Sequence, residues 1–271
     1  MFEILINQVR KCCPVNHFSR IINYRELLSE LVKRDLKIKY RRSVLGVLWS
    51  ILNPLLFMLI TTMIFSTMFK NQIQNFPIYF LTGQIMYAFF AESTSMAQMG
   101  VLGNGSLIKK VYTPKYIFPL SKIIFSLVNT CYSLLAILII FIIMGYSITL
   151  TALFFFIPIL LLFIFSTGVG LFLSCMTVFY RDLLHIYSII LSLLSFFSAT
   201  FYPIEIIPYP YRTFVEYNPV YVYIHYLRSL LIEGQFPDLT QNILAVAYSM
   251  VSLIIGFYIF NKNENKIVLH L

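Results

Sequence analysis

The sequence predicts an all-α membrane protein. We expect six transmembrane helices, an N-terminal amphipathic interfacial helix, and short re-entrant helices before the last span. The chain of 271 residues is 59% hydrophobic and only 11% charged, whereas soluble domains average about 25% charged residues. Several apolar stretches reach the roughly 20 residues needed to cross a bilayer. Ten of the 20 Lys and Arg residues precede Val44, which keeps costly charges out of those stretches.

Residues 1–43 are expected to form a cytoplasmic N-terminus that contains the amphipathic helix. Its apolar residues recur at helical spacing: Tyr24, Leu27, Leu28, Leu31 and Val32. Basic residues follow: Lys33, Arg34, Lys37, Lys39, Arg41 and Arg42. A helix with this pattern lies in the membrane interface. It could serve only as a topology anchor. The density of basic residues favours an additional contact with a partner or an anionic lipid head group.

The membrane domain is expected over residues 44–260, with a cytoplasmic tail at 261–271. We place the six spans at about 44–69, 77–100, 118–144, 150–180, 183–202 and 240–260. The segment 203–238 is rich in proline, and its longest near-apolar run, 220–232, is too short to span. We therefore expect short helices there that dip into the outer half of the bilayer, because irregular backbone at that depth must be buried in protein or line water.

The distribution of cations predicts the orientation of the spans. With both termini inside, only Lys70, Arg212 and Arg228 lie on the outer side, and the other 17 of the 20 Lys and Arg residues are cytoplasmic. This is a strong positive-inside bias. A seventh span at 220–232 would move Lys262 and Lys266 outside, which the rule disfavours. The net charge of +9 is therefore explained by cations on the cytoplasmic face, where they meet membrane lipids. We expect no nucleic-acid partner.

Four blocks of the sequence resemble type-2 ABC export permeases that move polysaccharides. They are ELVKRDLKIKYRRSVLGVLWSILNPLL at 30–56, NGSLIKKVYTPKYIFPLSKI at 104–123, FYRDLLHI at 179–186 and FYPIEIIPYPYRTFVEYNPVYVYIHYLR at 201–228. Each block is moderately specific, but together they follow the family's order from about residue 24 to 260.

The resemblance implies a function and a set of partners. The chain would be the membrane subunit of an ATP-driven exporter in the bacterial cytoplasmic (inner) membrane. It would act as a homodimer with two copies of a cytoplasmic ATP-binding subunit. Its cargo would be an undecaprenyl-linked polysaccharide, such as an O-antigen, a capsule or a teichoic-acid-like polymer. First and fifth spans of opposing subunits would form a lateral opening.

The chain is not expected to hydrolyse ATP. It contains no Gly-Lys dipeptide and therefore no P-loop of the usual form, so we expect no cofactor here, with ATP and Mg²⁺ on the partner ATPase. The glycine-rich, basic connector 102–115 is the expected docking element. Its candidate contact residues are Asn104, Leu107, Lys109, Lys110 and Tyr112. The alternative is an ordinary cytoplasmic loop that obeys the positive-inside rule.

Cargo recognition calls for different residue types at the two membrane faces. A pyrophosphate head group needs fixed cations near the inner interface, and the candidates are Arg41 and Arg42, with Arg181 behind them. On the outer side, tyrosines crowd the segment after the fifth span. They form either an interfacial belt or a gate whose rings stack on sugars. The candidates are Tyr202, Tyr209, Tyr211, Tyr217 and Tyr221.

Two further features leave alternatives open. Ser188, Ser192 and Ser195 give the fifth span one small face, which suits either close helix packing or a pore lining. Glu92 lies well inside a span, and we expect it to snorkel or to pair with a basic residue rather than relay protons. No catalytic grouping is visible. The alternative functions are a type-2 exporter of a small molecule or drug and a membrane-embedded polymer-modifying transferase, for which Glu92 and His185 are the candidate groups.

Overall fold

The computed structural model describes residues 24–41, 43–68, 73, 75–110, 113–146 and 149–270. Every regular element in these ranges is helical. The α-helices are α3 (Arg25–Tyr40), α4 (Leu48–Phe65), α5 (Phe76–Gln98), α6 (Gly105–Lys110), α7 (Ile117–Ile143), α8 (Phe156–Phe179), α9 (Leu183–Phe197), α10 (Tyr211–Glu216), α11 (Pro219–Arg228) and α12 (Leu239–His270). Shorter elements are the 3-10 turns η1 (Leu102–Asn104), η2 (Leu150–Phe154) and η3 (Ile204–Ile206) and the π-helical η4 (Ser229–Glu233).

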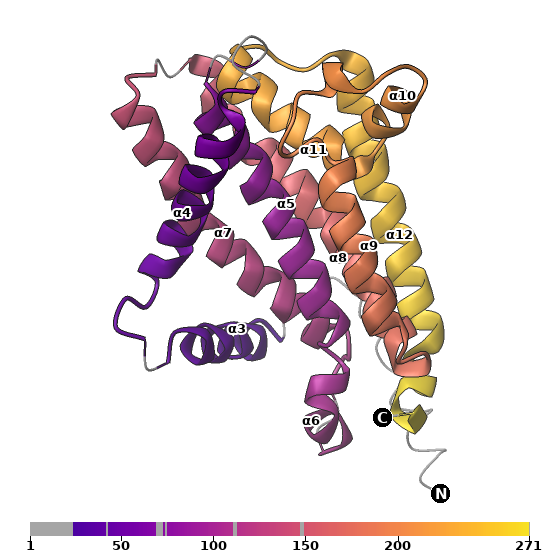
Figure 1. The fold of residues 1–271 in the computed structure, drawn as a ribbon. Coiled ribbons are helices and arrows are strands. Elements are labelled where there is room, and N and C mark those ends of the chain that lie inside the picture. Colours follow the sequence, from indigo (N-terminus) through magenta and orange to yellow (C-terminus); the bar gives the residue numbers. More distant parts are fainter. Residues whose placement is uncertain are drawn as a thin grey trace, which may run out of the picture.

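Long helices run side by side between two ends of different character (Figure 1). Helices α4, α5, α7, α8, α9 and α12 extend along the molecule, while α3 lies across one end and α6 projects from that same end. We call this the basic end, because the last turns of α3 and α6 carry lysines. Helices α10 and α11 lie at the opposite end, which we call the outer end. The topology predicted from the sequence places the basic end inside and the outer end outside.

Four helical segments are long and apolar enough to cross a membrane by themselves. They are Leu48–Phe65, Ile117–Ile143, Leu150–Phe179 and Leu239–His270. Helix α5 has 23 residues but carries a row of polar side chains that the bundle buries, among them Thr82, Ser93 and Thr94. Helix α9 is apolar but has only 15 residues. Length and composition of the helices therefore support four of the six predicted spans. Helix α12 also continues to His270, through the residues predicted to form a tail.

The tightest helix pair is α8 against α12. Gly168 and Gly256 face each other at the crossing, and a Cβ on either glycine would overlap the backbone of the opposite helix. Hydroxyls on α12 add hydrogen bonds across the pair. Ser252 Oγ donates to the Phe165 carbonyl at 2.9 Å, and Ser249 Oγ donates to the Leu161 carbonyl at 2.9 Å. Small residues let membrane helices approach closely, which explains why these two helices pack along their length.

Helices α4 and α9 are the least covered. Large apolar side chains stand exposed on α4, including Ile60 and Met63, and on α9, including Ile189 and Phe196. Exposed apolar side chains are the normal surface of a protein in lipid, where they meet hydrocarbon rather than water. The same faces are also available to a second protein.

Candidate functional site

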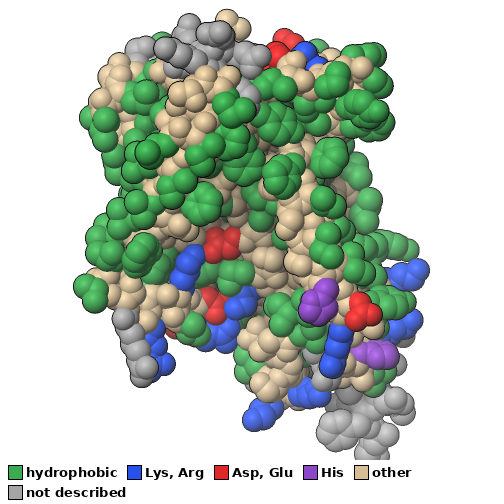
Figure 2. Space-filling view, viewed as in Figure 1, with side chains coloured by type: hydrophobic (Ala, Val, Ile, Leu, Met, Phe, Trp, Pro, Cys, Tyr) green, Lys and Arg blue, Asp and Glu red, His purple; other side chains and the backbone are tan. Residues whose placement is uncertain are grey.

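Cations gather at the basic end, and the flank above it is largely apolar (Figure 2). Here α3 is held against the bundle by its apolar residues. Leu31 is buried in a cluster with Ile108 of α6 and Phe118 of α7, while the charged side chain of Lys33 remains exposed. The helix is amphipathic, as its sequence pattern predicts.

A buried carboxylate fastens α3 to two other elements. Asp35 is only 6% exposed. Lys122 Nζ of α7 donates to Asp35 Oδ2 at 2.7 Å, and Arg34 Nη2 donates to Asp35 Oδ1 at 3.1 Å. Arg34 also donates to Asn104 Oδ1 at 3.3 Å, and Asn104 Nδ2 donates to the Gly100 carbonyl at 2.8 Å. This network joins α3 to α7 and to the segment that leads into α6.

The predicted docking residues divide between the inside and the surface of the loop. Asn104 is buried and occupied by the Arg34 network, and Leu107 packs against the apolar cluster of the basic end. Lys109 and Lys110 are exposed at the last turn of α6. Tyr112 lies outside the described residues. Of the predicted set that the structure describes, the two lysines are therefore the side chains free to meet a partner.

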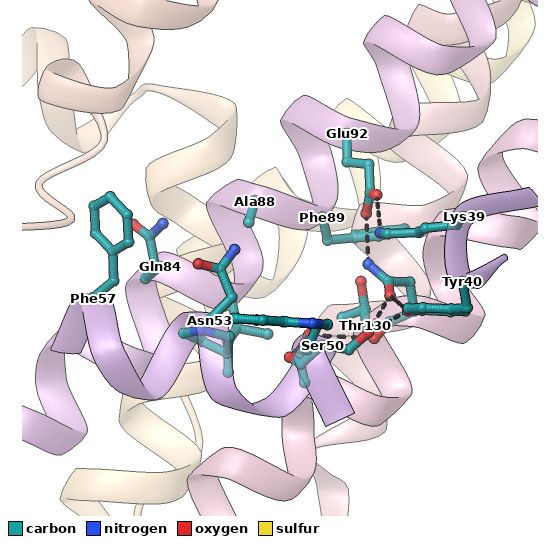
Figure 3. Close-up of a pocket in the computed structure, with 15 residues that line it drawn as sticks. Lys39, Tyr40, Ser50, Asn53, Phe57, Gln84, Ala88, Phe89, Glu92 and Thr130 are labelled. Carbon is teal, nitrogen blue, oxygen red and sulfur yellow. Dashed lines mark hydrogen bonds and ion pairs between the residues drawn. The ribbon is translucent and has the colours of Figure 1, made fainter. Parts of the chain in front are cut away.

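A cleft of about 590 Å³ opens between α4, α5 and α7, and the end of α3 contributes Lys39 and Tyr40 to its lining. Its lining is largely polar or aromatic, although most of the surrounding helix surface is apolar. The lining residues are Lys39, Tyr40, Trp49, Ser50, Asn53, Pro54, Phe57, Gln84, Ile85, Ala88, Phe89, Glu92, Asn129, Thr130 and Ser133. In Figure 3, Asn53 and Gln84 lie on the far side of the cleft from the Lys39–Glu92 pair.

Glu92 is the centre of the polar network in this cleft. Lys39 Nζ donates to Glu92 Oε1 at 2.7 Å, and Asn129 Nδ2 donates to Glu92 Oε2 at 3.0 Å. Tyr40 OH and Ser50 Oγ each donate to Asn129 Oδ1 at 2.7 Å. The prediction that Glu92 pairs with a basic residue is confirmed. The network also links four helices, because each of its residues comes from α3, α4, α5 or α7.

The predicted head-group arginines that the structure describes come from two different parts of the chain. Arg41 is exposed and follows α3 directly, next to the cleft-lining Tyr40. Arg42 lies outside the described residues. Arg181 is exposed in the turn between α8 and α9. Lys39, which the sequence pattern did not single out, is the cation that reaches into the cleft.

The predicted outer tyrosines have different surroundings. Tyr209, Tyr211 and Tyr217 are 84%, 66% and 58% exposed. Tyr202 is half-buried and donates to the Phe196 carbonyl at 2.5 Å. Tyr221, by contrast, is 6% exposed and belongs to a small apolar core. Three of the five side chains can therefore meet solvent, lipid or cargo, whereas Tyr221 is packed into the fold.

Arg228 is buried at the outer end, although the charge tally treats it as an outer surface cation. It is 4% exposed, and its guanidinium donates to the carbonyls of Ala199 at 3.1 Å, Tyr79 at 3.1 Å and Thr200 at 3.3 Å. The guanidinium carbon lies 3.5 Å from the centre of the Tyr79 ring. Gly83 makes room for it, since a Cβ there would come 2.5 Å from Arg228 Nη2. Arg228 thus ties α11 to α5 and to the end of α9.

The serine face of α9 points away from the chain's own bundle. Ser188 and Ser192 are exposed, and their hydroxyls donate to carbonyls one turn back in the same helix. Their hydrogen-bonding capacity is thus largely met within α9. Among the described residues no group of His, Cys, Asp and Glu could hold a metal ion.

Comparison with known proteins identifies the family of this chain. The chain matches the ABC-2 type transporter family over residues 26–232. It belongs to that family. It is 30% identical to an O-antigen export system permease protein of Klebsiella pneumoniae over 241 residues, 88% of this chain and 92% of that protein. A Myxococcus xanthus protein of the same name is 29% identical over 248 residues, 91% of this chain and 95% of that protein.

A third relative is named for a different polysaccharide. The polysialic acid transport protein of Escherichia coli is 24% identical over 246 residues, 88% of this chain and 93% of that protein. The family match begins in α3 and ends in η4. It therefore includes the Asp35 network, the cleft, α6 and the outer segment of this ABC-2 chain.

Proposed function

We propose that this chain is the membrane-spanning subunit of an ATP-driven exporter that moves undecaprenyl-linked polysaccharide across the bacterial cytoplasmic membrane. The observation that carries the proposal is the near full-length similarity to permeases named for O-antigen export, over 88% to 91% of the chain. The lack of a P-loop in the sequence supports ATP hydrolysis on a separate subunit.

Deleting this chain from its host tests the function directly. Surface polysaccharide should be lost, and undecaprenyl-linked polymer should accumulate inside the cell, because synthesis continues while export stops. Re-expression of the intact chain should restore the surface polymer. Surface polysaccharide that is unchanged in the deletion strain, measured by gel analysis and by staining of intact cells, would overturn the proposal.

The proposed topology has six spans, formed by α4, α5, α7, α8, α9 and α12. Helix α5 can cross the bilayer despite its polar residues, because many of them are buried in the bundle rather than exposed to lipid. The cations of α3 and α6 then lie on the cytoplasmic side with both termini, and α10 and α11 form the outer segment.

Cysteine labelling checks this topology. In a chain without its native cysteines, an impermeant reagent added to intact cells should label Tyr211→Cys and leave Ser106→Cys unlabelled, although both native side chains are exposed. After permeabilisation both positions should react. Labelling of Ser106→Cys but not Tyr211→Cys in intact cells would contradict the proposed orientation.

The proposed assembly is a homodimer with two ATP-binding subunits. One chain has one basic docking element at α6, so two chains give two such elements for a two-ATPase machine. The exposed apolar faces of α4 and α9 supply surfaces on which two copies can meet. These are the helices of the first and fifth proposed spans.

Reversing the charge at the tip of α6 should weaken the ATPase complex. A Lys109→Glu/Lys110→Glu variant changes two exposed side chains. We expect the ATPase to co-purify at a clearly lower yield and export to fall, with membrane insertion unchanged. A single exposed ion pair is worth only about 0–1 kcal/mol, so the double reversal is needed. Normal complex yield and normal export would exclude these lysines from docking.

Arg41 and Arg42 remain our proposed contacts for the lipid-linked pyrophosphate, with Arg181 as an additional cation at the same face. A guanidinium donates paired hydrogen bonds to phosphate oxygens, which a lysine cannot reproduce. Arg41 is exposed at the end of α3, where such a head group would reach it. The surface-polymer assay on an Arg41→Gln/Arg42→Gln variant checks this assignment, and full export would exclude it.

A further inference from the structure

We propose that the cleft between α4, α5 and α7 is a carbohydrate subsite that holds an uncharged sugar residue of the cargo. The proposal rests on the proposed export function, and it assigns a ligand class to a cavity near the basic end. Its volume of about 590 Å³ lies within the range of about 300–1,000 Å³ typical of small-ligand sites.

Unused amide groups in the cleft point to a ligand with hydroxyl groups. The side chains of Asn53 and Gln84 line the cleft but make no hydrogen bond to any residue in the described chain. Each amide offers donors and an acceptor. A polar cavity beside lipid-facing helices must be filled by water or by a polar ligand, because unpaired polar groups are costly there. Vicinal sugar hydroxyls can donate and accept at once, which matches the amide groups.

The aromatic side chains of the lining suit the apolar face of a sugar ring. Trp49 and Phe57 are about half exposed, at 48% and 56%. Both line the cleft from α4 and lie two turns apart along that helix. Aromatic rings present large apolar faces at little cost in conformational entropy. A pyranose ring could therefore stack on one of them while its hydroxyls reach Asn53 or Gln84.

The charges in the cleft favour an uncharged ligand over a phosphate. Glu92 Oε1 is bound to Lys39 Nζ at 2.7 Å, so the two formal charges of the lining cancel. The remaining lining side chains are uncharged. A diphosphate would meet the Glu92 carboxylate without gaining an unpaired cation, which opposes its binding. The cleft is thus distinct in chemistry from the arginines that follow α3.

Trp49 gives a direct measure of binding, because it is the only tryptophan in the chain. The full-length protein in lipid vesicles would be titrated with undecaprenyl-linked glycan extracted from the host, and with sugar-free undecaprenyl diphosphate. We expect the glycan to change the Trp49 emission and the sugar-free lipid to leave it unchanged. An equal change with both lipids would overturn the proposal, because the cleft would then respond to the lipid or its diphosphate.

Variants of the amides test the same site by affinity. Asn53→Leu and Gln84→Met remove the amides at similar volume, and each should weaken glycan binding roughly fivefold, the effect of one lost hydrogen bond. Ile60→Met, on the exposed face of α4 and absent from the lining, is the matched control and should bind normally. Gln84→Glu keeps the size and an acceptor, so it covers the case in which an apolar substitution disturbs folding. It should bind within about twofold of the unmodified chain, since an uncharged sugar is not repelled and still finds an acceptor there.

The export assay separates failure of this site from failure of the proposed function. If deleting the chain removes the surface polymer but the Asn53→Leu/Gln84→Met variant binds and exports normally, only the carbohydrate subsite is wrong. If deletion leaves the surface polymer unchanged, the proposed function itself fails. Reduced glycan affinity and reduced export in the double variant, with normal protein level and thermal unfolding, would support the subsite.

Discussion

Replacing Asp35 with Asn should strongly destabilise the basic end of the molecule. The substitution keeps the size of the side chain but removes the buried charge that Lys122 contacts at 2.7 Å. Lys122 is itself only 16% exposed in its side chain, so its ammonium would lose its carboxylate partner in a poorly hydrated place. Breaking one side of a buried ion pair costs about 3–5 kcal/mol. We expect a clearly lower unfolding temperature in detergent.

An exposed ion pair on the same helix provides the control. Glu30 binds Lys33 one turn away, and both side chains are about two-thirds exposed. Glu30→Gln should therefore change stability by only about 0–1 kcal/mol. Thermal unfolding of the two variants, followed by loss of the monodisperse chromatographic peak, gives the comparison. Equal unfolding temperatures for Asp35→Asn and Glu30→Gln would contradict the role assigned to the buried pair.

The Asp35 network also predicts that the destabilisation will extend from α3 to α6. Arg34 contacts both Asp35 and Asn104, so the same network that holds α3 also holds the segment entering α6. Loosening it should reduce co-purification of the ATPase even though Lys109 and Lys110 are unchanged. Helix α3 also connects this network to the cleft, since it carries Asp35 and, one turn later, Lys39.

Local patterns in the sequence predict the helices better than they predict the site. Apolar runs and charged connectors locate most helices, because the cost of charge in lipid acts on each segment separately. The sequence pattern does not identify Asp35 as a functional residue, although it lies one turn after Leu31 on the apolar stripe of α3. A carboxylate at that position signals a buried partner. The partner, Lys122, is distant in sequence, and no periodicity identifies it.

Sequence patterns are equally insufficient to predict the contacts of the cleft and of the outer segment. Glu92 stands out because it is an acidic residue inside a span, and its pairing with a cation follows from the cost of a lone charge. Asn53 and Gln84 look unremarkable in an apolar sequence, and only their shared position around one cavity makes them a candidate site. Tyr221 resembles its neighbouring tyrosines in sequence, yet packing buries it. Contacts between distant segments decide all of these cases.

Replacing Arg228 with Met should release the outer segment from the bundle. Methionine keeps an unbranched apolar stem but cannot donate to the carbonyls of Ala199 and Thr200, which follow the end of α9. Each buried carbonyl left without a donor costs about 1–3 kcal/mol, so the loss should be about 2–6 kcal/mol in all. The Tyr79 carbonyl is less affected, because Thr82 Oγ1 also donates to it at 2.9 Å. Arg228→Lys should rescue poorly, since an ammonium cannot copy the planar fork that reaches several carbonyls.

Arg212 is the matched control for this prediction. It lies in the same outer segment, but its side chain is 40% exposed and pairs with Glu216 one turn away. Arg212→Met should change the stability little, because an exposed ion pair on a helix surface contributes little. Protease digestion from the outer side should therefore cut the 203–238 segment faster in Arg228→Met and at the normal rate in Arg212→Met. Equal digestion rates and equal unfolding temperatures in the two variants would show that Arg228 does not anchor the segment, whatever its burial.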